Sequence, residues 1–420
     1  MSGNNNIPKT KFVINKVIDI DENPFDRQER IFWWDQETLI NSKVMVVGAG
    51  AIGNETLKNL ALLGVGNLFI VDFDTISTSN LSRTVLFRQN DTGKKKAEIA
   101  AQRIKELSPL ENINVNWFHG DAVWELGSGV FRAMDIVLGC LDNVETRLAI
   151  NRQCWLVNVP WIDSGIYELG GHVSVFMPPN PPCYQCGATA KQLIAARRRY
   201  SCDDFKRTVF EEGKMPTVQI TSSIISAIQV QETIKFLCGQ SVTSGKKIYF
   251  QGKTNDFDVL GLPVKEDCLA HATYPDIIPL PLTNSIKLKD FLQYVAQDSY
   301  SGAGATLDLR SDRTFVVSVP CKKCGIDLEI YKPAFRVFDT ETTCNHCRQT
   351  DIQEVTFNNE RDYVRHAEFN LVKTDERILD MSLSDLGIPS HHIVAVYDGH
   401  GNYKYYELSE EKAIFQMCLN

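Results

Sequence analysis

Residues 43–53 read KVMVVGAGAIG, and this stretch decides the fold class of the chain. Val44–Val47 is a short apolar run, typical of a buried strand, and a helical pattern follows it. Between the two, Gly48 and Gly50 permit a tight turn and a close approach of the backbone to phosphate, and Gly53 permits close packing of the helix. The amino end of such a helix offers free N–H groups and a positive dipole end to an anion. The stretch therefore predicts a phosphate-binding βαβ turn.

Strand-like and helix-like segments alternate outward from this turn. The expected elements are, in order, a strand at Val44–Val47, a helix at Ile52–Leu63, a strand at Leu68–Val71, a helix at Lys95–Leu107 and a strand at Met134–Cys140. Strands that alternate with helices form a parallel sheet with helices on both faces. We therefore expect an α/β fold with a doubly wound, mostly parallel, Rossmann-like sheet. We expect this sheet to continue through a strand at His172–Met177 and a helix at Ser222–Leu237.

Changes in composition divide the chain into three parts. We expect an N-terminal arm with helices at residues 1–42, a nucleotide-binding domain at residues 43–275, and a separate α+β domain at residues 285–420. A polar, basic connection at residues 187–217 interrupts the second part. A connection of this length inside a compact domain is usually functional or mobile.

The composition is that of a globular protein: of 420 residues, 43% are hydrophobic and 23% are charged. The formal charge of -8 argues against nucleic acid or an anionic membrane as the main partner. No apolar run reaches about 18 residues, and the first residues, MSGNNNIPKTKF, lack an apolar export segment. The 12 cysteines supply most of four short C-x-x-C or C-x-x-H half-sites, which suggest metal rather than disulfides. We therefore expect a cytoplasmic protein with no nucleic-acid or membrane partner.

Charged side chains follow the strands at positions that can converge. Asp72 ends the second strand, and Arg83 lies in the connection after it. Lys96 opens the next helix, and Asp142 follows the strand at Met134–Cys140. In a doubly wound sheet these strand ends open on one crevice. Two cations and a carboxylate suit a nucleoside triphosphate with magnesium, which a nicotinamide-dependent dehydrogenase does not need. Taken singly, each of these residues could be an ordinary surface group, but their joint placement favours the triphosphate.

These motifs occur in a fixed order along the chain. They are Gly48-Ala49-Gly50-Ala51-Ile52-Gly53, Asp72-Phe73-Asp74, Asn80-Leu81-Ser82-Arg83, Lys96 and Cys140-Leu141-Asp142-Asn143. The ordered series resembles the ubiquitin-activating enzyme superfamily, which includes the ThiF- and MoeB-like adenylating enzymes of sulfur carriers. The resemblance covers about residues 20–275. Among its relatives, bacterial activating enzymes of ubiquitin-like conjugation operons look most similar to this chain.

The resemblance implies that the crevice binds ATP with Mg²⁺. The residues implied to form the ATP site are Gly48, Gly50, Ala51, Gly53, Asp72, Asp74, Asn80, Arg83, Lys96 and Asp142. Within this set, the two acidic residues of the second strand's end serve the ribose and the metal region. The amide and the two cations hold phosphates, and Asp142 coordinates magnesium.

The resemblance also implies the reaction, which is adenylation of the C-terminal glycine of a ubiquitin-like β-grasp protein. In the family, a cysteine of the crossover region, here matched by Cys202, takes the activated acyl group as a thioester before transfer to a conjugating-type enzyme. Three arginines before Cys202 would lower the pKa of its thiol, whereas Asp203 and Asp204 oppose that effect. The family usually has small residues after this cysteine, so a free loop cysteine is the alternative interpretation.

Arg27 is the remaining residue to which the resemblance gives a role. In the family, an N-terminal arginine that precedes glutamine reaches into the ATP site of the partner subunit. Arg27 precedes Gln28, so the resemblance implies a homodimer with composite sites. The alternative is that Arg27 is one solvated charge of an exposed charged run.

Cysteine and histidine half-sites predict two zinc sites. The first set comprises Cys183, Cys186, Cys268 and His271, and the second comprises Cys321, Cys324, Cys344 and Cys347. Four ligands leave no open position on a tetrahedral zinc, so both sites are expected to be structural. The spacing of the second set is typical of a zinc ribbon. We expect this ribbon-containing domain to recruit a partner protein.

Three other functions are alternatives to this interpretation. A sulfur-carrier adenylyltransferase would pass the activated carboxylate to a sulfur donor instead of Cys202. A degenerate scaffold would only bind a β-grasp protein, but Arg83, Lys96 and Asp142 are all intact. An NAD-dependent oxidoreductase would use the same glycine turn without needing the two cations.

Overall fold

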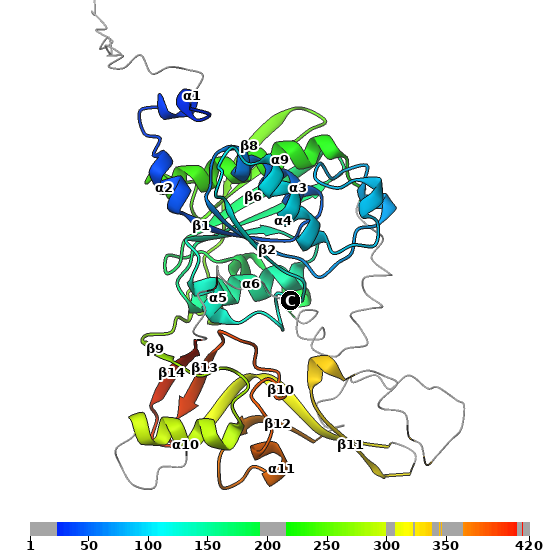
Figure 1. Cartoon of the computed structure of the whole chain (residues 1–420), viewed down its shortest axis with the longest axis vertical. Helices are drawn as coiled ribbons and strands as arrows, with labels where there is room; N and C mark the ends of the chain where they lie inside the picture. Colours follow the sequence, from blue (N-terminus) through cyan, green and yellow to red (C-terminus); the bar gives the residue numbers. More distant parts are fainter. Residues whose placement is uncertain are drawn as a thin grey trace, which may run out of the picture.

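The computed structural model of the chain describes residues 23–193, 216–299, 307–321, 324–337 and 364–409, with positions 344, 346 and 414. Most of residues 43–261 form an eight-stranded sheet covered by helices (Figure 1). In spatial order its strands are β3 (Asn114–Phe118), β2 (Asn67–Val71), β1 (Lys43–Val47), β4 (Ile136–Cys140), β5 (Trp161–Tyr167), β6 (Gly170–Phe176), β7 (Lys246–Gln251) and β8 (Asp256–Gly261).

The sheet confirms the expected α/β fold, because the five strands from β3 to β5 run parallel. From β5 onward the pairing is antiparallel through β6, β7 and β8. Glu168 and Leu169 alone separate β5 from β6, and so short a connection cannot cross over to a parallel neighbour. The strand expected at His172–Met177 therefore exists as β6, but it turns back along β5.

Alternation along β1 divides the core between two helical layers. Val44 and Val46 belong to the core beneath α3, α4 and α9, while Met45 and Val47 belong to the core beneath α5 and α6. Figure 1 shows these two groups of helices on opposite faces of the sheet. The sheet is therefore buried on both faces, as its nearly continuous apolar strands require.

Helices make up much of the rest of the described residues. They are α1 (Asp26–Glu29), α2 (Gln36–Asn41), α3 (Ala51–Leu62), α4 (Lys96–Leu107), α5 (Ser128–Arg132), α6 (Val144–Leu156), α9 (Gln219–Leu237), α10 (Leu288–Ser299) and α11 (Glu376–Leu379). Short 3₁₀ turns are η1 (Thr78–Asn80), η2 (Gln89–Asp91), η3 (Tyr184–Gly187), η4 (Leu269–His271) and η5 (Ala334–Arg336). Within the described part of the chain, no helix combines the length and apolar character that a bilayer crossing needs.

A second, six-stranded sheet follows the first along the chain. Its strands run in the order β11 (Asp327–Pro333), β10 (Asp308–Pro320), β13 (Ile393–Tyr397), β14 (Tyr403–Leu408) and β9 (Ile277–Leu280), and β12 (Val364–Phe369) pairs with β10. The helix α10 packs on it through Leu288, Phe291, Leu292 and Val295, which are fully buried and recur at helical spacing. A separate core of α+β type therefore lies in the C-terminal part of the chain.

The two sheets meet at α5. The amide of Gly129 donates to the carbonyl of His391 at 2.7 Å, and the amide of Ile393 donates to the Ser128 hydroxyl at 3.0 Å. Arg132 pairs with Glu407 of β14. A Cβ atom at Gly129 would lie 2.3 Å from Glu407, so glycine lets the second sheet approach the α5 backbone closely.

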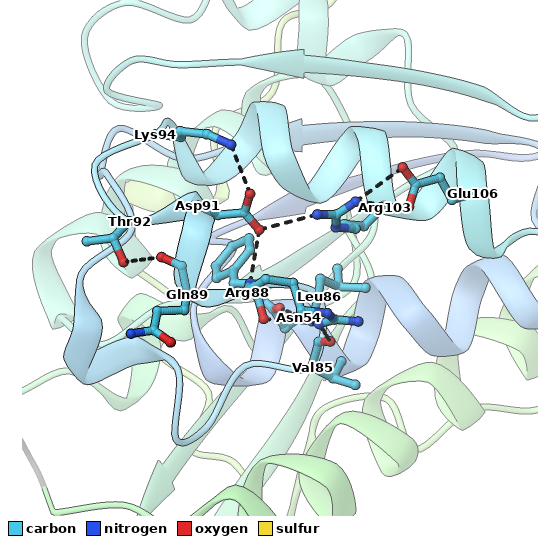
Figure 2. Close-up of polar contacts among 11 residues, drawn as sticks. Asn54, Val85, Leu86, Arg88, Gln89, Asp91, Thr92, Lys94, Arg103 and Glu106 are labelled. Atoms are coloured by element: carbon cyan, nitrogen blue, oxygen red, sulfur yellow. Dashed lines mark hydrogen bonds and ion pairs between the residues drawn. The ribbon is translucent and has the colours of Figure 1, made fainter.

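The connection between β2 and α4 contains a loop, residues 75–95, whose two ends lie together. We call it the Arg83 segment. The amide of Ile76 donates to the carbonyl of Lys94 at 2.8 Å and closes its base. Figure 2 shows the buried carboxylate of Asp91 at its centre, accepting from the Arg88 amide at 2.9 Å and from the Lys94 ammonium at 3.1 Å. Arg103 of α4 lies 3.5 Å from the same carboxylate. Asp91 therefore fastens the segment to α4.

Replacing Asp91 should weaken the fold in a pH-dependent way. Burial acts to raise the pKa of Asp91, but the Lys94 hydrogen bond, the Arg88 amide and the charges of Lys94 and Arg103 outweigh it and lower the pKa below its ordinary value. Asp91→Asn should lower the free energy of unfolding by about 1–2 kcal/mol at neutral pH. Because a lowered carboxyl pKa stabilises the fold only above that pKa, the difference should shrink below about pH 4. Urea unfolding of both proteins across acid pH measures it, and a pH-independent difference would contradict the assignment.

Candidate functional site

The glycine turn between β1 and α3 is built by close backbone contacts. Gly48 has a φ of +96°, and a Cβ atom there would lie 2.4 Å from the carbonyl oxygen of Cys140. A Cβ atom at Gly53 would lie 1.9 Å from the carbonyl oxygen of Gly48. At Gly50, by contrast, nothing lies within 4 Å of the Cβ position. The turn is thus tightly packed against β4 and open on the side of Gly50, where the amino end of α3 can meet an anion.

An acidic pair and a lysine adjoin this turn. Asp72 accepts from the amide of Ala49 and from the amide of Asp74, both at 2.7 Å. The ammonium of Lys96 lies 2.6 Å from the exposed Asp74 carboxylate, although Lys96 itself is only 7% exposed. Burial raises the pKa of Asp72, and the charge of Lys96 and the two amides limit the rise. The structure therefore brings the glycine turn, Asp72, Asp74 and Lys96 into direct contact.

Asp142 reaches the same edge of the sheet through strand pairing. The parallel register pairs Val47 of β1 with Gly139 of β4, so the turn after β1 and the turn after β4 leave the sheet side by side. Asp142 is exposed, and its carboxylate accepts from the Asn143 side chain at 3.2 Å. Asn143 in turn caps α6 by accepting from the amide of Thr146 at 2.8 Å. The exposed carboxylate therefore stands at the carboxyl edge of the sheet, next to the start of α6.

A buried arginine that the sequence interpretation missed supports this turn. The guanidinium of Arg147 donates to the carbonyl of Leu141 at 2.6 Å, to the carbonyl of Ser164 at 3.0 Å and to the carboxylate of Asp163 at 2.9 Å. Asp163 is fully buried and Arg147 is 9% exposed. Because Leu141 directly precedes Asp142, this ion pair holds the backbone from which Asp142 projects. A carboxylate inside the apolar strand β5 was the available signal.

Arg83 and Asn80 lie on the Arg83 segment. The guanidinium of Arg83 donates to the carbonyl of Ser79 at 3.0 Å. The Asn80 side chain accepts from the amide of Ser77 at 2.9 Å and so caps η1. In this arrangement Asn80 shapes the turn that carries Arg83, so both residues belong to the segment rather than to the sheet.

Arg27, an expected catalytic residue, lies away from the glycine turn. Arg27 is exposed on α1, and its neighbour Gln28 donates to the carbonyl of Leu63 at 3.1 Å, just beyond the last residue of α3. The glycine turn is at the other end of α3, which with 12 residues is about 18 Å long. Arg27 is therefore remote from the glycine turn of its own chain. Cys202, the expected nucleophile, lies outside the described residues.

The first expected metal set converges. Donor atoms of Cys183, Cys186, Cys268 and His271 all lie within 4.8 Å of one another. Cys183 Sγ is 3.7 Å from the Sγ of both Cys186 and Cys268, and Cys186 Sγ is 3.2 Å from His271 Nε2. The ring of Trp155 stacks on His271 with 4.4 Å between centroids. Three thiols and an imidazole in a largely buried cluster fit a closed, tetrahedral zinc site.

The second set converges as far as it is described. Sulfur atoms of Cys321, Cys324 and Cys344 lie within 4.8 Å of one another, while Cys347 is outside the described residues. The first two cysteines lie in the turn between β10 and β11, where the amide of Gly325 donates to the carbonyl of Cys321 at 2.8 Å. Gly325 has a φ of +71°, which this tight turn requires. Three thiols on two loops fit the larger part of a zinc ribbon.

Residues 25–270 match the ThiF family. The chain belongs to the ThiF family. This match spans the glycine turn, the acidic pair, Lys96 and Asp142, and it confirms the resemblance inferred from their order. The second sheet, which begins at Ile277, lies beyond the residues that the ThiF family matches.

Named relatives agree with membership of the ThiF family. SUMO-activating enzyme subunit 2 of Dictyostelium discoideum is 43% identical over 160 residues, which make up 38% of this chain and 23% of that protein. Molybdopterin-synthase adenylyltransferase of Escherichia coli K12 is 32% identical over 236 residues, or 56% of this chain and 88% of that protein. The matched part of this chain spans from 23% to 62% of the length of its first four curated relatives.

A solved structure agrees with the fold. The crystal structure of Escherichia coli MccB gives a TM-score of 0.50 at 22% identity, over 60% of this chain and 73% of MccB. At this level of identity the likeness concerns the fold alone. It supports the α/β architecture of this ThiF-family chain.

The two cysteine clusters predict about two zinc ions per chain, because the first set offers four ligands and three ligands of the second converge, with Cys347 as the expected fourth. Cys183→Ser should lower the content to about one zinc and destabilise the protein, since the site joins η3 to η4. Elemental analysis of the purified protein measures both effects. Cys238→Ser, which changes a cysteine outside both clusters, is the control and should keep the full content. A wild-type content near zero would contradict both sites.

Proposed function

We propose that this chain is an ATP-dependent activating enzyme that adenylates the C-terminal carboxylate of a ubiquitin-like protein. Membership of the ThiF family supports this, as do relatives that are named activating enzymes and adenylyltransferases. The observation that carries the proposal is the contact set at the carboxyl edge of the sheet. There the open glycine turn touches Asp72, and the nearly buried Lys96 reaches Asp74.

The proposed reaction joins the substrate carboxylate to AMP. A carboxylate oxygen attacks the α-phosphorus of ATP, the bond from that phosphorus to the oxygen bridging to the β-phosphate breaks, and pyrophosphate leaves with the bonding electrons. The product is a mixed anhydride whose leaving group is AMP. The protein contributes alignment and charge stabilisation rather than a covalent bond in this step.

Each residue of the cluster has a task in this proposal. The amino end of α3 and the open turn at Gly50 accept phosphate oxygens, and Lys96 offsets their charge. The carboxylate oxygens of Asp72 have lone pairs left after accepting two amides, so they can accept from ribose hydroxyls. Asp142 and Asp74 offer exposed carboxylates for Mg²⁺, which when bound would neutralise charge on the phosphates.

We further propose a homodimer in which Arg27 completes the site of the partner subunit. The distance between α1 and the glycine turn of the same chain supports a role in trans. Near α1, Phe32 is fully exposed and Ile31 is 41% exposed, which gives this end of the molecule apolar surface for a second copy. We also propose that the two cysteine clusters hold structural zinc and that a conjugating-type enzyme accepts the activated protein.

Replacing Lys96 tests the adenylation site directly. Lys96→Ala should reduce ATP–pyrophosphate exchange by about 100-fold or more, because one preorganised cation next to the phosphates is lost. The assay uses a small protein ending in glycine, recovered by pull-down with the wild-type chain.

Lys105→Ala is the matched control, since Lys105 lies exposed at the other end of the same helix. It should leave exchange unchanged. Exchange by Lys96→Ala at the rate of the control would remove Lys96 from the mechanism and contradict the proposed site.

We propose that the activated carbonyl is then attacked by the Cys202 thiolate, which forms a thioester and releases AMP. The alternative is a sulfur-carrier enzyme, which would pass the adenylate to a sulfur donor and need no adduct on Cys202. With ATP and the small protein, the wild type should form a covalent adduct that thiols cleave, and Cys202→Ala should not. Both proteins should retain pyrophosphate exchange. An equal adduct in both, or in neither, would contradict the thioester step and favour the sulfur-carrier alternative.

A further inference from the structure

The proposed ATP site is assembled from two pieces that the strands do not connect directly. The glycine turn is fixed to β1 and β4, while Arg83 is carried by the Arg83 segment, a separate excursion between β2 and α4. Asp91 fastens the far part of this segment to α4. The distance between the glycine turn and Arg83 therefore depends on a contact of the segment closer to Arg83.

Asn54 supplies that contact. Its side-chain Nδ2 donates to the carbonyl of Ala49 at 2.7 Å and to the carbonyl of Gly50 at 3.1 Å. Its Oδ1 accepts from the backbone amide of Leu86 at 2.9 Å. Asn54 is fully buried and lies one residue after Gly53, in the first turn of α3. Figure 2 places Asn54 beside Val85 and Leu86 of the Arg83 segment.

We propose that Asn54 is a positioning residue of the triphosphate site, joining the glycine turn to the Arg83 segment. One side chain holds two carbonyls of the turn with its donors and one amide of the segment with its acceptor. Leu86 follows Arg83 by three residues, so Asn54 holds the segment between Arg83 and the anchor at Asp91. The inference rests on the proposed function, because it requires a triphosphate that both pieces contact.

The chemistry of the contact requires a carboxamide of this length. Alanine would leave the Leu86 amide and two turn carbonyls without this partner in a buried site, which costs free energy. Serine keeps one hydroxyl but is too short to bridge both pieces. Because Leu86 and Phe87 are themselves buried in the core, loss of the bridge should shift the Arg83 segment rather than unfold it.

The experiment compares ATP–Mg and AMP binding by titration calorimetry. Arg83 acts on phosphate charge, so displacing it should weaken ATP binding more than AMP binding. Asn54→Ala should lower the ratio of ATP to AMP affinity by roughly tenfold, because small displacements of a positioned group have large effects. A purely structural defect would weaken both nucleotides alike and leave the ratio unchanged, which would overturn the proposal.

A matched control comes from the same helix. Asn59, also on α3, donates to the Ser226 hydroxyl at 3.4 Å and points towards α9. Asn59→Ala removes the same side chain from the same helix and should keep the wild-type ratio. If Asn54→Ala folds poorly, Asn54→Ser tests the same ratio, with thermal unfolding to verify the folded fraction.

A double-mutant cycle tests the connection to Arg83. If Asn54 acts by placing Arg83, the Asn54→Ala, Arg83→Ala double variant should lose less ATP affinity than the product of the two single losses. Strictly multiplicative losses would overturn the inference while leaving the ATP site intact. A wild-type chain that binds no ATP would instead contradict the proposed function itself, so the two failures are distinguishable.

Discussion

The backbone contact between the glycine turn and the end of β4 is the constraint on which the proposed site depends. Gly48 lies against the carbonyl of Cys140, and Gly53 lies against Gly48, with no space for a Cβ atom at either position. These contacts seat the amino end of α3 directly over the edge of β1 and β4. Asp142 follows Cys140 by two residues, so the same contacts fix the amino end of α3, the proposed phosphate site, against the chain that leads to Asp142.

Buried polar side chains hold the strands and the turn at this edge. Gln229 of α9 is fully buried and donates to the carbonyls of Gly139 and Ile162, at 3.1 Å and 2.9 Å, while accepting from the Thr56 hydroxyl at 3.0 Å. Arg147 does the same for the turn that precedes Asp142. Such groups are costly to bury unless they are paired. Their pairing here fixes the backbone beside the proposed site, so that its exposed charged groups project from a rigid frame.

Periodicity and motif spacing in the sequence predicted the elements whose position depends on neighbouring residues. Apolar periodicity placed β1 and α3 within one or two residues, and the glycine spacing located the turn. The pairing of Cys183 with Cys268 across 85 residues was predicted because two ligands of a tetrahedral zinc site require two more elsewhere in the chain. Periodicity gave no sign of β3, whose sequence NVNWF is half polar, nor of the contacts between α5 and the second sheet. Asn54 resembles any polar helix residue in sequence, because a single contact between distant segments leaves no repeat to detect.

The central claim is that the crevice binds a nucleoside triphosphate, and calorimetric titration of the wild-type chain with ATP–Mg and with NAD tests it most directly. A dinucleotide site and a triphosphate site share the glycine turn, but only the latter uses Lys96 and Arg83 to offset phosphate charge. The account predicts saturable binding of ATP–Mg at concentrations where NAD gives no comparable heat. Preferential binding of NAD would contradict the proposed triphosphate site and would leave the fold unaffected.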